Sequence, residues 1–257
     1  MPGGYPAFQE IFNGNSNGVV TATSLGTGVV SGIANTKGAY SQLVASTASD
    51  TSWMTVCIYS GGTSAFTTAI DIAVGAAGSE KVIAANLIDP TISVGASIVY
   101  SFPMQIPAGT RIAARSQGDT ATQTTDVHIV LHDGSFTQME GIAGVDSIGF
   151  LTASSKGTTI DPGGTANTKG AYSQLSASTA VDYMGLMIAI DPLGASPATA
   201  GTVLLDIAIG AAASEKIIIP DLFFFHGLTV ITPRVFGPFF VPISAGTRIA
   251  ARARRSR

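Results

Sequence analysis

Residues Asp71–Ile83 read DIAVGAAGSEKVI, and residues Asp206–Ile218 read DIAIGAAASEKII. Two further stretches occur twice, ANTKGAYSQL at 34–43 and 166–175, and AGTRIAAR at 108–115 and 245–252. The spacing between matching stretches grows along the chain, from 132 residues (34 to 166) to 135 (71 to 206) and 137 (108 to 245). A period this long, with a drifting offset, indicates a duplicated domain with small loop insertions rather than a solenoid.

The repeats predict four parts of the chain: an N-terminal arm over 1–17, a first repeat over 18–137, a linker over 138–147 and a second repeat over 148–257. At 257 residues, the chain is long enough for each half to bury a core of its own. The linker, QMEGIAGVDS, is short and contains glycine, which favours a tight connection.

Apolar residues alternate with others along most segments, and no window keeps the i, i+3, i+4, i+7 spacing of an amphipathic helix over about 11 residues. The clearest strand has large apolar residues at alternate positions in both repeats: Met54, Val56 and Ile58 in the first, and Leu186, Ile188 and Ile190 in the second. The intervening positions differ freely between the repeats. We therefore expect the apolar face of this strand to be core in both.

Glycine and proline divide the first repeat into eight predicted strands, near 19–25, 38–47, 53–59, 67–75, 80–88, 97–106, 110–117 and 124–132. Short strands at even spacing favour a β-sandwich, and jelly-roll topology is the expected connectivity. The predicted fold class is all-β, with two tandem homologous β-sandwich (jelly-roll-like) domains.

The second repeat has no counterpart of the strand predicted over 124–132, because AGTRIAAR is followed only by 253–257. A sandwich that lacks its last strand exposes a sheet edge. We expect the gap to be filled by the N-terminal segment Tyr5–Phe12 or by a neighbouring subunit.

Charged residues make up only 11% of the chain, against a usual value of about 25%. Such a neutral, hydroxyl-rich surface suits an assembly component and equally suits a compact β protein with few charges. The net charge of −3 provides no general attraction for nucleic acid, and a nucleic-acid partner is not expected. One local exception is a C-terminal run of arginines, which can contact phosphate or an acidic partner but is more simply a solvated end or an inter-subunit contact: Arg248, Arg252, Arg254, Arg255 and Arg257.

Targeting and membrane signals are not expected either. The uncharged stretch 91–109 contains Pro103 and Pro107, and the stretch 223–243 is interrupted by His226, Arg234 and three prolines. Neither suits a spanning helix of about 20 apolar residues. The N-terminus lacks the basic and apolar regions of a signal peptide.

No residue pattern predicts catalysis, and we expect no catalytic, cofactor-binding or metal-binding residues, no cofactor and no enzymatic activity. Cys57, the single cysteine, corresponds to Ala189 and fits a small packed side chain. His128 and His132 share a strand face but lie about 13 Å apart, too far for one metal ion.

The carboxylates shared by both repeats are Asp71 with Asp206, and Glu80 with Glu215. A hydrolytic pair would need them to converge in a cleft. The simpler interpretation is that Asp71 binds a loop amide or an arginine, and that Glu80 with Lys81 caps a turn.

The other shared charges also have structural interpretations. Arg111 and Arg115, with their counterparts Arg248 and Arg252, alternate along one strand face and can pair with the shared aspartates. Lys37 and Lys169 lie in Asn-Thr-Lys-Gly loops, for which we expect a backbone role, with Asn and Gly at turn or positive-φ positions.

DIAVGAAGSEKVI followed by PMQIPAGTRIAAR (103–115) resembles β-sandwich modules of structural proteins of tailed bacteriophages. The resemblance covers Asp71–Ile83 and Phe102–Arg115, and again Asp206–Ile218 and Phe239–Arg252. It implies a virion protein without enzymatic activity, which decorates or joins head, collar or tail. The implied partners are other virion proteins (capsid, collar or tail subunits) and further copies of the chain in a homo-oligomer.

The alternative is a receptor- or carbohydrate-binding module of a phage tail, since jelly rolls also host lectins. Sugar sites favour exposed aromatic residues. Trp53 and Tyr59 share a strand face, but Gly185 and Asp191 replace them in the second repeat. Tyr40 is shared as Tyr172, although packing against the loop explains it as well. A glycan hydrolase is the least expected of the three.

Overall fold

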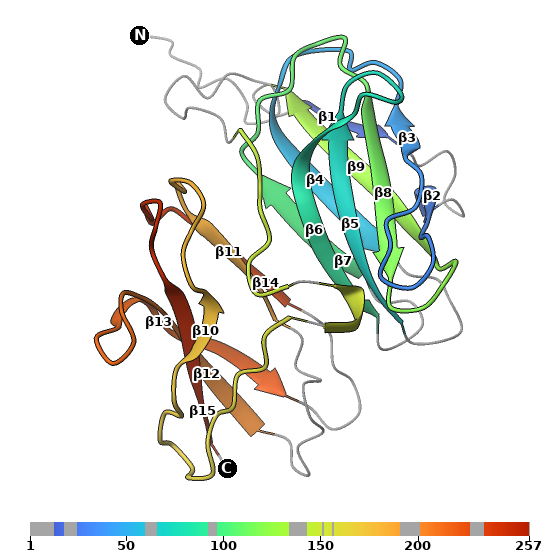
Figure 1. Ribbon diagram of the computed structural model, residues 1–257. Coiled ribbons are helices and arrows are strands. Elements are labelled where there is room, and N and C mark those ends of the chain that lie inside the picture. The colour runs from blue at the N-terminus through green and yellow to red at the C-terminus, as the bar shows by residue number, and fades with distance from the viewer. Residues whose placement is uncertain are drawn as a thin grey trace, which may run out of the picture. The chain divides into compact units, whose positions relative to one another are not determined.

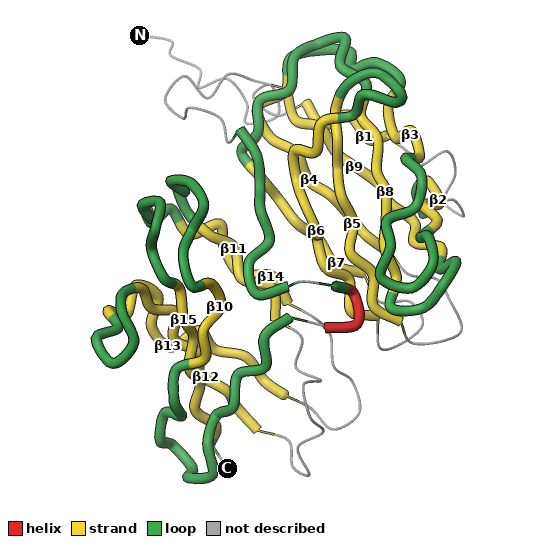
Figure 2. The backbone as a smooth tube through the Cα atoms, in the orientation of Figure 1, coloured by secondary structure: helices red, strands yellow, loops and turns green. Residues whose placement is uncertain are grey.

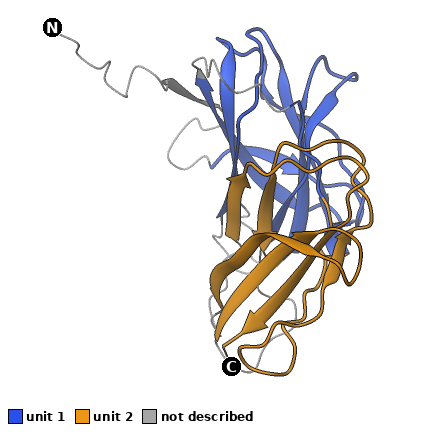
Figure 3. Cartoon of the chain, turned by 90° about the vertical axis from the view of Figure 1, so that its left-hand side faces the viewer, with its two compact units in different colours: residues 1–147, 152–154 blue, residues 148–151, 155–257 orange. Residues whose placement is uncertain are grey.

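The computed structural model describes residues 13–17, 25–59, 66–91, 97–133, 143–150, 152–155, 157–190, 201–226 and 234–256. Contacts divide the chain into two compact units, unit 1 (1–147 with 152–154) and unit 2 (148–151 with 155–257), as Figure 3 shows. The described residues form strands and loops with a single 3-10 helix, η2 (Ala153–Ser155), and no α-helix (Figure 2). The predicted all-β class is therefore confirmed. No helix within the described ranges has the length and apolarity to cross a membrane.

The described residues of unit 1 form two antiparallel sheets (Figure 1). The first has the strand order β1 (Asn13–Asn17), β9 (Thr124–Asp133), β4 (Thr51–Tyr59) and β7 (Ser97–Phe102), and β2 (Thr27–Val30) also pairs with β9. The second has the order β3 (Ser41–Val44), β8 (Ile112–Gly118), β5 (Phe66–Val74) and β6 (Lys81–Thr91).

The core of unit 1 uses the alternating apolar residues of both sheets. Met54, Val56 and Ile58 are each 0% exposed, so the predicted core face of this strand is confirmed in the first repeat. Ile70 and Ile72 of the other sheet are fully buried as well. Each such side chain contributes about 1.5–3 kcal/mol to folding.

Of the first predicted strand, over 19–25, only Leu25 is described and it belongs to no strand; the next described strand is β2, over Thr27–Val30. The other predicted strands of the first repeat each overlap an observed one. Residues 13–17, predicted as part of an arm, form β1 and pair with β9.

Unit 2 repeats the second sheet of unit 1 in the same order, as β10 (Ser173–Ser176), β15 (Ile249–Arg255), β12 (Gly201–Ile209) and β13 (Lys216–His226). Within the described ranges, its other sheet consists of β11 (Leu186–Ile190) and β14 (Arg234–Phe239). The irregularities recur too: the β5–β6 register shifts on both sides of Ile72, and the β12–β13 register shifts on both sides of Ile207.

The face of β11 that we predicted as core is only partly buried, and this corrects the expectation for the second repeat. Leu186, Ile188 and Ile190 pack against the core of unit 2 but are not enclosed by it. The physical reason is the missing neighbour: β4 lies between β7 and β9, whereas β11 pairs only with β14 within the described ranges. The segment Tyr5–Phe12, which we expected to fill this gap, lies outside the described residues.

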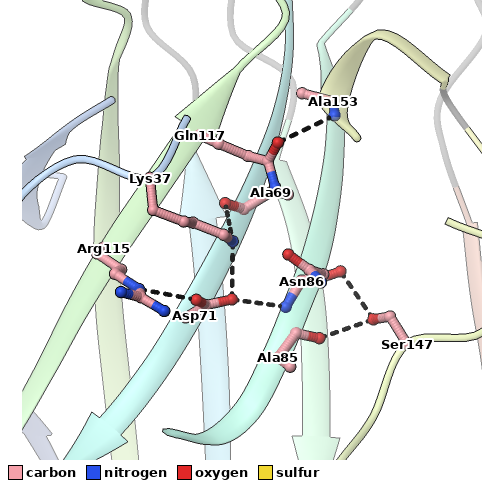
Figure 4. Close-up of polar contacts among 9 residues, drawn as sticks. All are labelled: Lys37, Ala69, Asp71, Ala85, Asn86, Arg115, Gln117, Ser147 and Ala153. Atoms are coloured by element: carbon pink, nitrogen blue, oxygen red, sulfur yellow. Dashed lines mark hydrogen bonds and ion pairs between the residues drawn. The ribbon is translucent and has the colours of Figure 1, made fainter. Parts of the chain in front are cut away.

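Part of the predicted linker runs along the edge of β6 and belongs to unit 1. Val145 N donates to Ile83 O at 2.8 Å, and Ala85 N donates to Val145 O at 2.9 Å. Ser147 Oγ donates to the carbonyls of Ala85 and Asn86 at 2.7 and 2.9 Å (Figure 4). This segment thus covers backbone groups that β6 would otherwise expose. Residues 138–142 of the linker lie outside the described ranges.

Candidate functional site

The densest group of charged side chains in unit 1 surrounds Asp71, in the middle of β5 (Figure 4). Its carboxylate is only 4% exposed. Oδ1 accepts from Lys37 Nζ at 2.7 Å and from the backbone N–H of Asn86 at 2.9 Å, while Oδ2 accepts from Arg115 Nε at 2.9 Å. A buried carboxylate with these donors is fully compensated for its loss of water.

Three neighbouring segments deliver these donors for different local reasons. The β5–β8 register places Arg115 directly opposite Asp71. Asn86 adopts a positive φ of 50°, which Asn tolerates better than most residues, at the irregular part of the β5–β6 pairing. Lys37 comes from the repeated ANTKG loop.

That loop is fixed to the end of β8 by its own backbone. Asn35 N donates to Gly118 O at 2.7 Å, and Gly38 N donates to Ser116 O at 2.8 Å. Asn35 has a φ of 58°, and Gly38 lies so close to the Val30 carbonyl that a side chain would not fit. The expected backbone role of the loop is therefore present, and Lys37 adds a bond from Nζ to Ala69 O at 3.1 Å.

Unit 2 builds the same cluster. Asp206 accepts from Lys169 Nζ at 2.7 Å, from Arg252 Nε at 3.1 Å and from the backbone N–H of Asp221 at 3.0 Å. Asp221 replaces Asn86 and adds a second carboxylate, which lies 2.7 Å from Lys169 Nζ and 3.6 Å from Arg254. The expected pairing of Arg115 and its counterpart with the shared aspartates is confirmed.

The shared tyrosines complete both clusters. The guanidinium of Arg115 lies over the Tyr40 ring at 4.8 Å from its centroid, and that of Arg252 lies over Tyr172 at 4.6 Å. Such cation–π contacts are worth about 0.5–1 kcal/mol at partly exposed sites. Packing, rather than a free aromatic surface, therefore accounts for these two tyrosines.

Burial and ion pairing act in opposite directions on the charged groups. Burial lowers the pKa of Lys37 even though its bond to Asp71 favours the charged form. For Asp206, burial would raise the pKa, but the donors from Lys169, the Asp221 backbone and Arg252 outweigh it and lower the pKa below its usual value.

A second pair of ion pairs holds the turn after β5 and its counterpart after β12. Arg111 Nη1 lies 3.0 Å from Glu80, and Arg248 Nη1 lies 3.0 Å from Glu215. Glu80 also accepts from the backbone N–H of Gly78 at 2.9 Å, as expected for a turn cap. Arg111 and Arg248 thus pair with the shared glutamates, and not with the aspartates.

The repeated AGT turn is fixed from the segment before β4. Thr47 Oγ1 donates to Pro107 O at 2.7 Å and accepts from Thr110 N at 3.0 Å. Asp50 accepts from Ala108 N at 2.7 Å. Thr179 and Asp182 make the same bonds in unit 2. Sequence reasoning missed these residues, although the repeated AGT stretch is a sign that the turn needs fixed partners.

The C-terminal arginines are mostly engaged inside unit 2. Arg248, Arg252 and Arg254 pair with Glu215, Asp206 and Asp221. This corrects the expectation of a freely solvated end for these three. Arg257 lies outside the described residues.

The chemistry that these clusters support is structural: each joins adjacent strands to a loop through paired charges. Within the described ranges, no three His, Cys, Asp or Glu residues gather as metal ligands. A shallow hollow of about 60 Å³ is lined by 44, 46–49, 51 and 131; small-molecule sites usually have about 300–1,000 Å³. Burial raises the pKa of the Cys57 thiol, which disfavours the reactive thiolate.

Comparison with known proteins adds no assignment: neither a family model nor a curated protein matches the sequence.

Proposed function

We propose that this chain is a structural virion protein of a tailed bacteriophage, made of two homologous jelly-roll-like β-sandwich domains. It decorates or joins head, collar or tail through protein–protein contacts, without catalysis and as a homo-oligomer. The resemblance of Asp71–Ile83 and Phe102–Arg115 to phage structural modules supports the virion assignment.

One observation carries the assembly role. The shared charges of the two clusters and of the two turns pair with one another inside each unit, whereas unit 2 presents an apolar strand edge at β11 that its described residues do not cover. Charges that are satisfied internally leave broad, weakly charged surfaces for association. An open strand edge offers backbone groups that another chain can pair with.

A receptor- or carbohydrate-binding module is the second candidate. Phe223 and Phe225, which are two apart on β13, are 58% and 55% exposed, while Phe224 between them is buried. Sugars stack on exposed aromatic rings, so this pair is the observation that favours the alternative.

The test is to purify phage particles from the culture that produces the chain, by density gradient, and to analyse them by mass spectrometry and immunogold electron microscopy. We expect the chain at fixed stoichiometry on the particles. Its presence only in the soluble lysate would refute the proposal. Binding on a glycan array, lost in Phe225→Ala, would instead support the second candidate.

A further inference from the structure

We propose that residues 143–147 and 152–154 form a strap that closes the β6 edge of unit 1 and prevents this edge from pairing with another copy of the chain. Both segments belong to unit 1 by their contacts. The strap is held at two anchors, one on β6 and one at the end of β8. Its role does not depend on the virion assignment, and it determines which edge of unit 1 is excluded from assembly.

The first anchor occupies the outer backbone groups of β6. This strand lies at one end of its sheet, and an uncovered end strand offers a row of N–H and C=O groups to other chains. Val145 runs parallel to the edge, donates to Ile83 O and accepts from Ala85 N. The hydroxyl of Ser147 lies 2.7 and 2.9 Å from the carbonyls of Ala85 and Asn86 (Figure 4). Together these bonds cover the edge over 83–86.

The second anchor lies at the end of β8. Ala153 N donates to Gln117 Oε1 at 3.3 Å, and Ala153 is 0% exposed. The side-chain amide of Asn35 makes two bonds to Ser154: its Oδ1 accepts from Ser154 N at 2.9 Å, and its Nδ2 donates to Ser154 Oγ at 2.8 Å. One amide that binds both the backbone and the side chain of a residue fixes its position and its orientation.

The buried charges of unit 1 connect the two anchors (Figure 4). Asp71 Oδ1 accepts from the N–H of Asn86, whose carbonyl binds the strap. It also accepts from Lys37, two residues after Asn35 in the same fixed loop. Arg115, which bonds the other carboxylate oxygen, lies on β8 two residues before the second anchor. The strap therefore binds elements whose positions the buried cluster fixes.

Unit 2 keeps the charged cluster but changes the groups that bind the strap. Pro220 replaces Ala85 and has no N–H to donate. Arg254 replaces Gln117, and a guanidinium has no acceptor for a backbone N–H. The shared fold therefore does not require the strap-binding groups, and their presence in unit 1 is explained by the strap.

The proline of unit 2 indicates what the strap does. Like β6, β13 is an end strand in the order of the described strands. Natural sheets protect such edges by covering them with a loop or by placing proline on them. Pro220 lies at the position where Ala85 pairs with the strap in unit 1. The two units thus protect the same edge at the same position by two different means, and edge protection is what the two means share.

The test releases the first anchor in the full-length chain. Val145→Pro with Ser147→Ala removes the N–H that bonds Ile83 and the hydroxyl that binds the next two carbonyls. Hydrogen exchange with mass spectrometry should show the amides of 83–86 exchanging at least about tenfold faster. Sedimentation velocity should show association that rises with concentration and exceeds that of the unaltered chain.

Ala85→Pro provides the matched control, because it copies Pro220 of unit 2. Added to the double variant, it removes a backbone donor from the uncovered edge. Association should then return to that of the unaltered chain, although exchange over 83–86 stays fast. If circular dichroism shows that the double variant does not fold, Ser147→Ala with and without Ala85→Pro decides the question by the same two measurements.

A second matched pair tests the anchor on β8. Asn35→Ala and Asn167→Ala place alanine at the same point of the repeated loop, with φ of 58° and 60°, so both variants carry the same backbone strain. Exchange over 152–154 should become at least about tenfold faster in Asn35→Ala and stay unchanged in Asn167→Ala.

Three outcomes overturn the inference: unchanged exchange over 83–86 in the double variant, faster exchange without added association, or added association that persists with Ala85→Pro. Equal exchange over 152–154 in the two asparagine variants would refute the second anchor. The particle analysis is separate: a chain that is present on particles but does not associate through an uncovered β6 edge refutes the strap and leaves the proposed function standing.

Discussion

Replacing Asp71 with asparagine should destabilise unit 1 by about 3 kcal/mol. The change keeps the size of the side chain but removes the charge that Lys37 and Arg115 share, at 2.7 and 2.9 Å. Breaking a buried ion pair costs about 3–5 kcal/mol, because the remaining charge stays buried without a partner. The lower end applies here, because the Lys37 and Arg115 side chains are 18% and 32% exposed and keep some contact with water.

A second substitution distinguishes an unpaired charge from lost packing. Lys37→Met removes the more deeply buried cation and keeps most of the volume. In the double variant with Asp71→Asn, no buried lysine is left uncompensated, so the loss should shrink by more than about 1 kcal/mol relative to Asp71→Asn alone.

The assay is urea unfolding followed by tryptophan fluorescence. The single tryptophan, Trp53, lies in β4, so the signal reports unit 1. The midpoint should fall without a change in slope, as expected for a loss of stability in the same folded state. Lys81→Gln, at an exposed position, is the matched control and should stay within about 0.5 kcal/mol. A loss below about 1 kcal/mol in Asp71→Asn, or a double variant no more stable than the single one, would refute the reasoning.

Four other outcomes test separate parts of the structure. Thr47→Val should cost about 1–3 kcal/mol in the same urea assay, because its buried hydroxyl bonds a carbonyl at 2.7 Å and an N–H at 3.0 Å. Gly75→Ala should cost about 1–3 kcal/mol there too, because a φ of 112° strains any residue with a Cβ. The pKa values of Asp206 and Glu215 are lowered in the folded chain from their ordinary values of 3.8 and 4.5. Their contribution to stability is therefore complete above the ordinary pKa values and is lost as pH falls through the lowered pKa values. The urea midpoint, followed by circular dichroism, should fall between about pH 6 and about pH 3. Because burial raises the pKa of Cys57, its reaction with a disulfide reagent at about pH 8 should be many-fold slower than in the urea-unfolded chain.

Much of the fold follows from the sequence because strand periodicity is a local property. The alternation through Met54, Val56 and Ile58 identifies both a strand and its inward face, and all three are fully buried. Alternation also predicts that arginines of the next strand pair with Asp71, and the register decides which: Arg115 pairs with Asp71, whereas Arg111 pairs with Glu80. Two copies of one pattern make such inferences stronger than a single copy does.

The rest depends on contacts that no local pattern encodes. Lys37 reaches Asp71 only because the backbone of its loop is fixed to β8, and the N–H of Asn86 points at the carboxylate only because its φ is positive. Leu186 has the same pattern as Met54 but is less buried, because burial depends on which strand lies beside it. Periodicity identifies a face and cannot supply its neighbour.

The two units also show which contacts recur between them and which differ. The bond from lysine to the shared aspartate measures 2.7 Å in both, in Lys37–Asp71 and in Lys169–Asp206, although the surrounding loops differ in length. The differences lie instead at the sheet edges, where Pro220 blocks β13 and where β11 has no counterpart of β9 among the described strands. Breaking a buried ion pair costs about 3–5 kcal/mol, so stability alone favours the persistence of the charged clusters in both units. The clusters therefore fix the common frame of the two units, because each ties a loop and a neighbouring strand to the same central strand, β5 or β12.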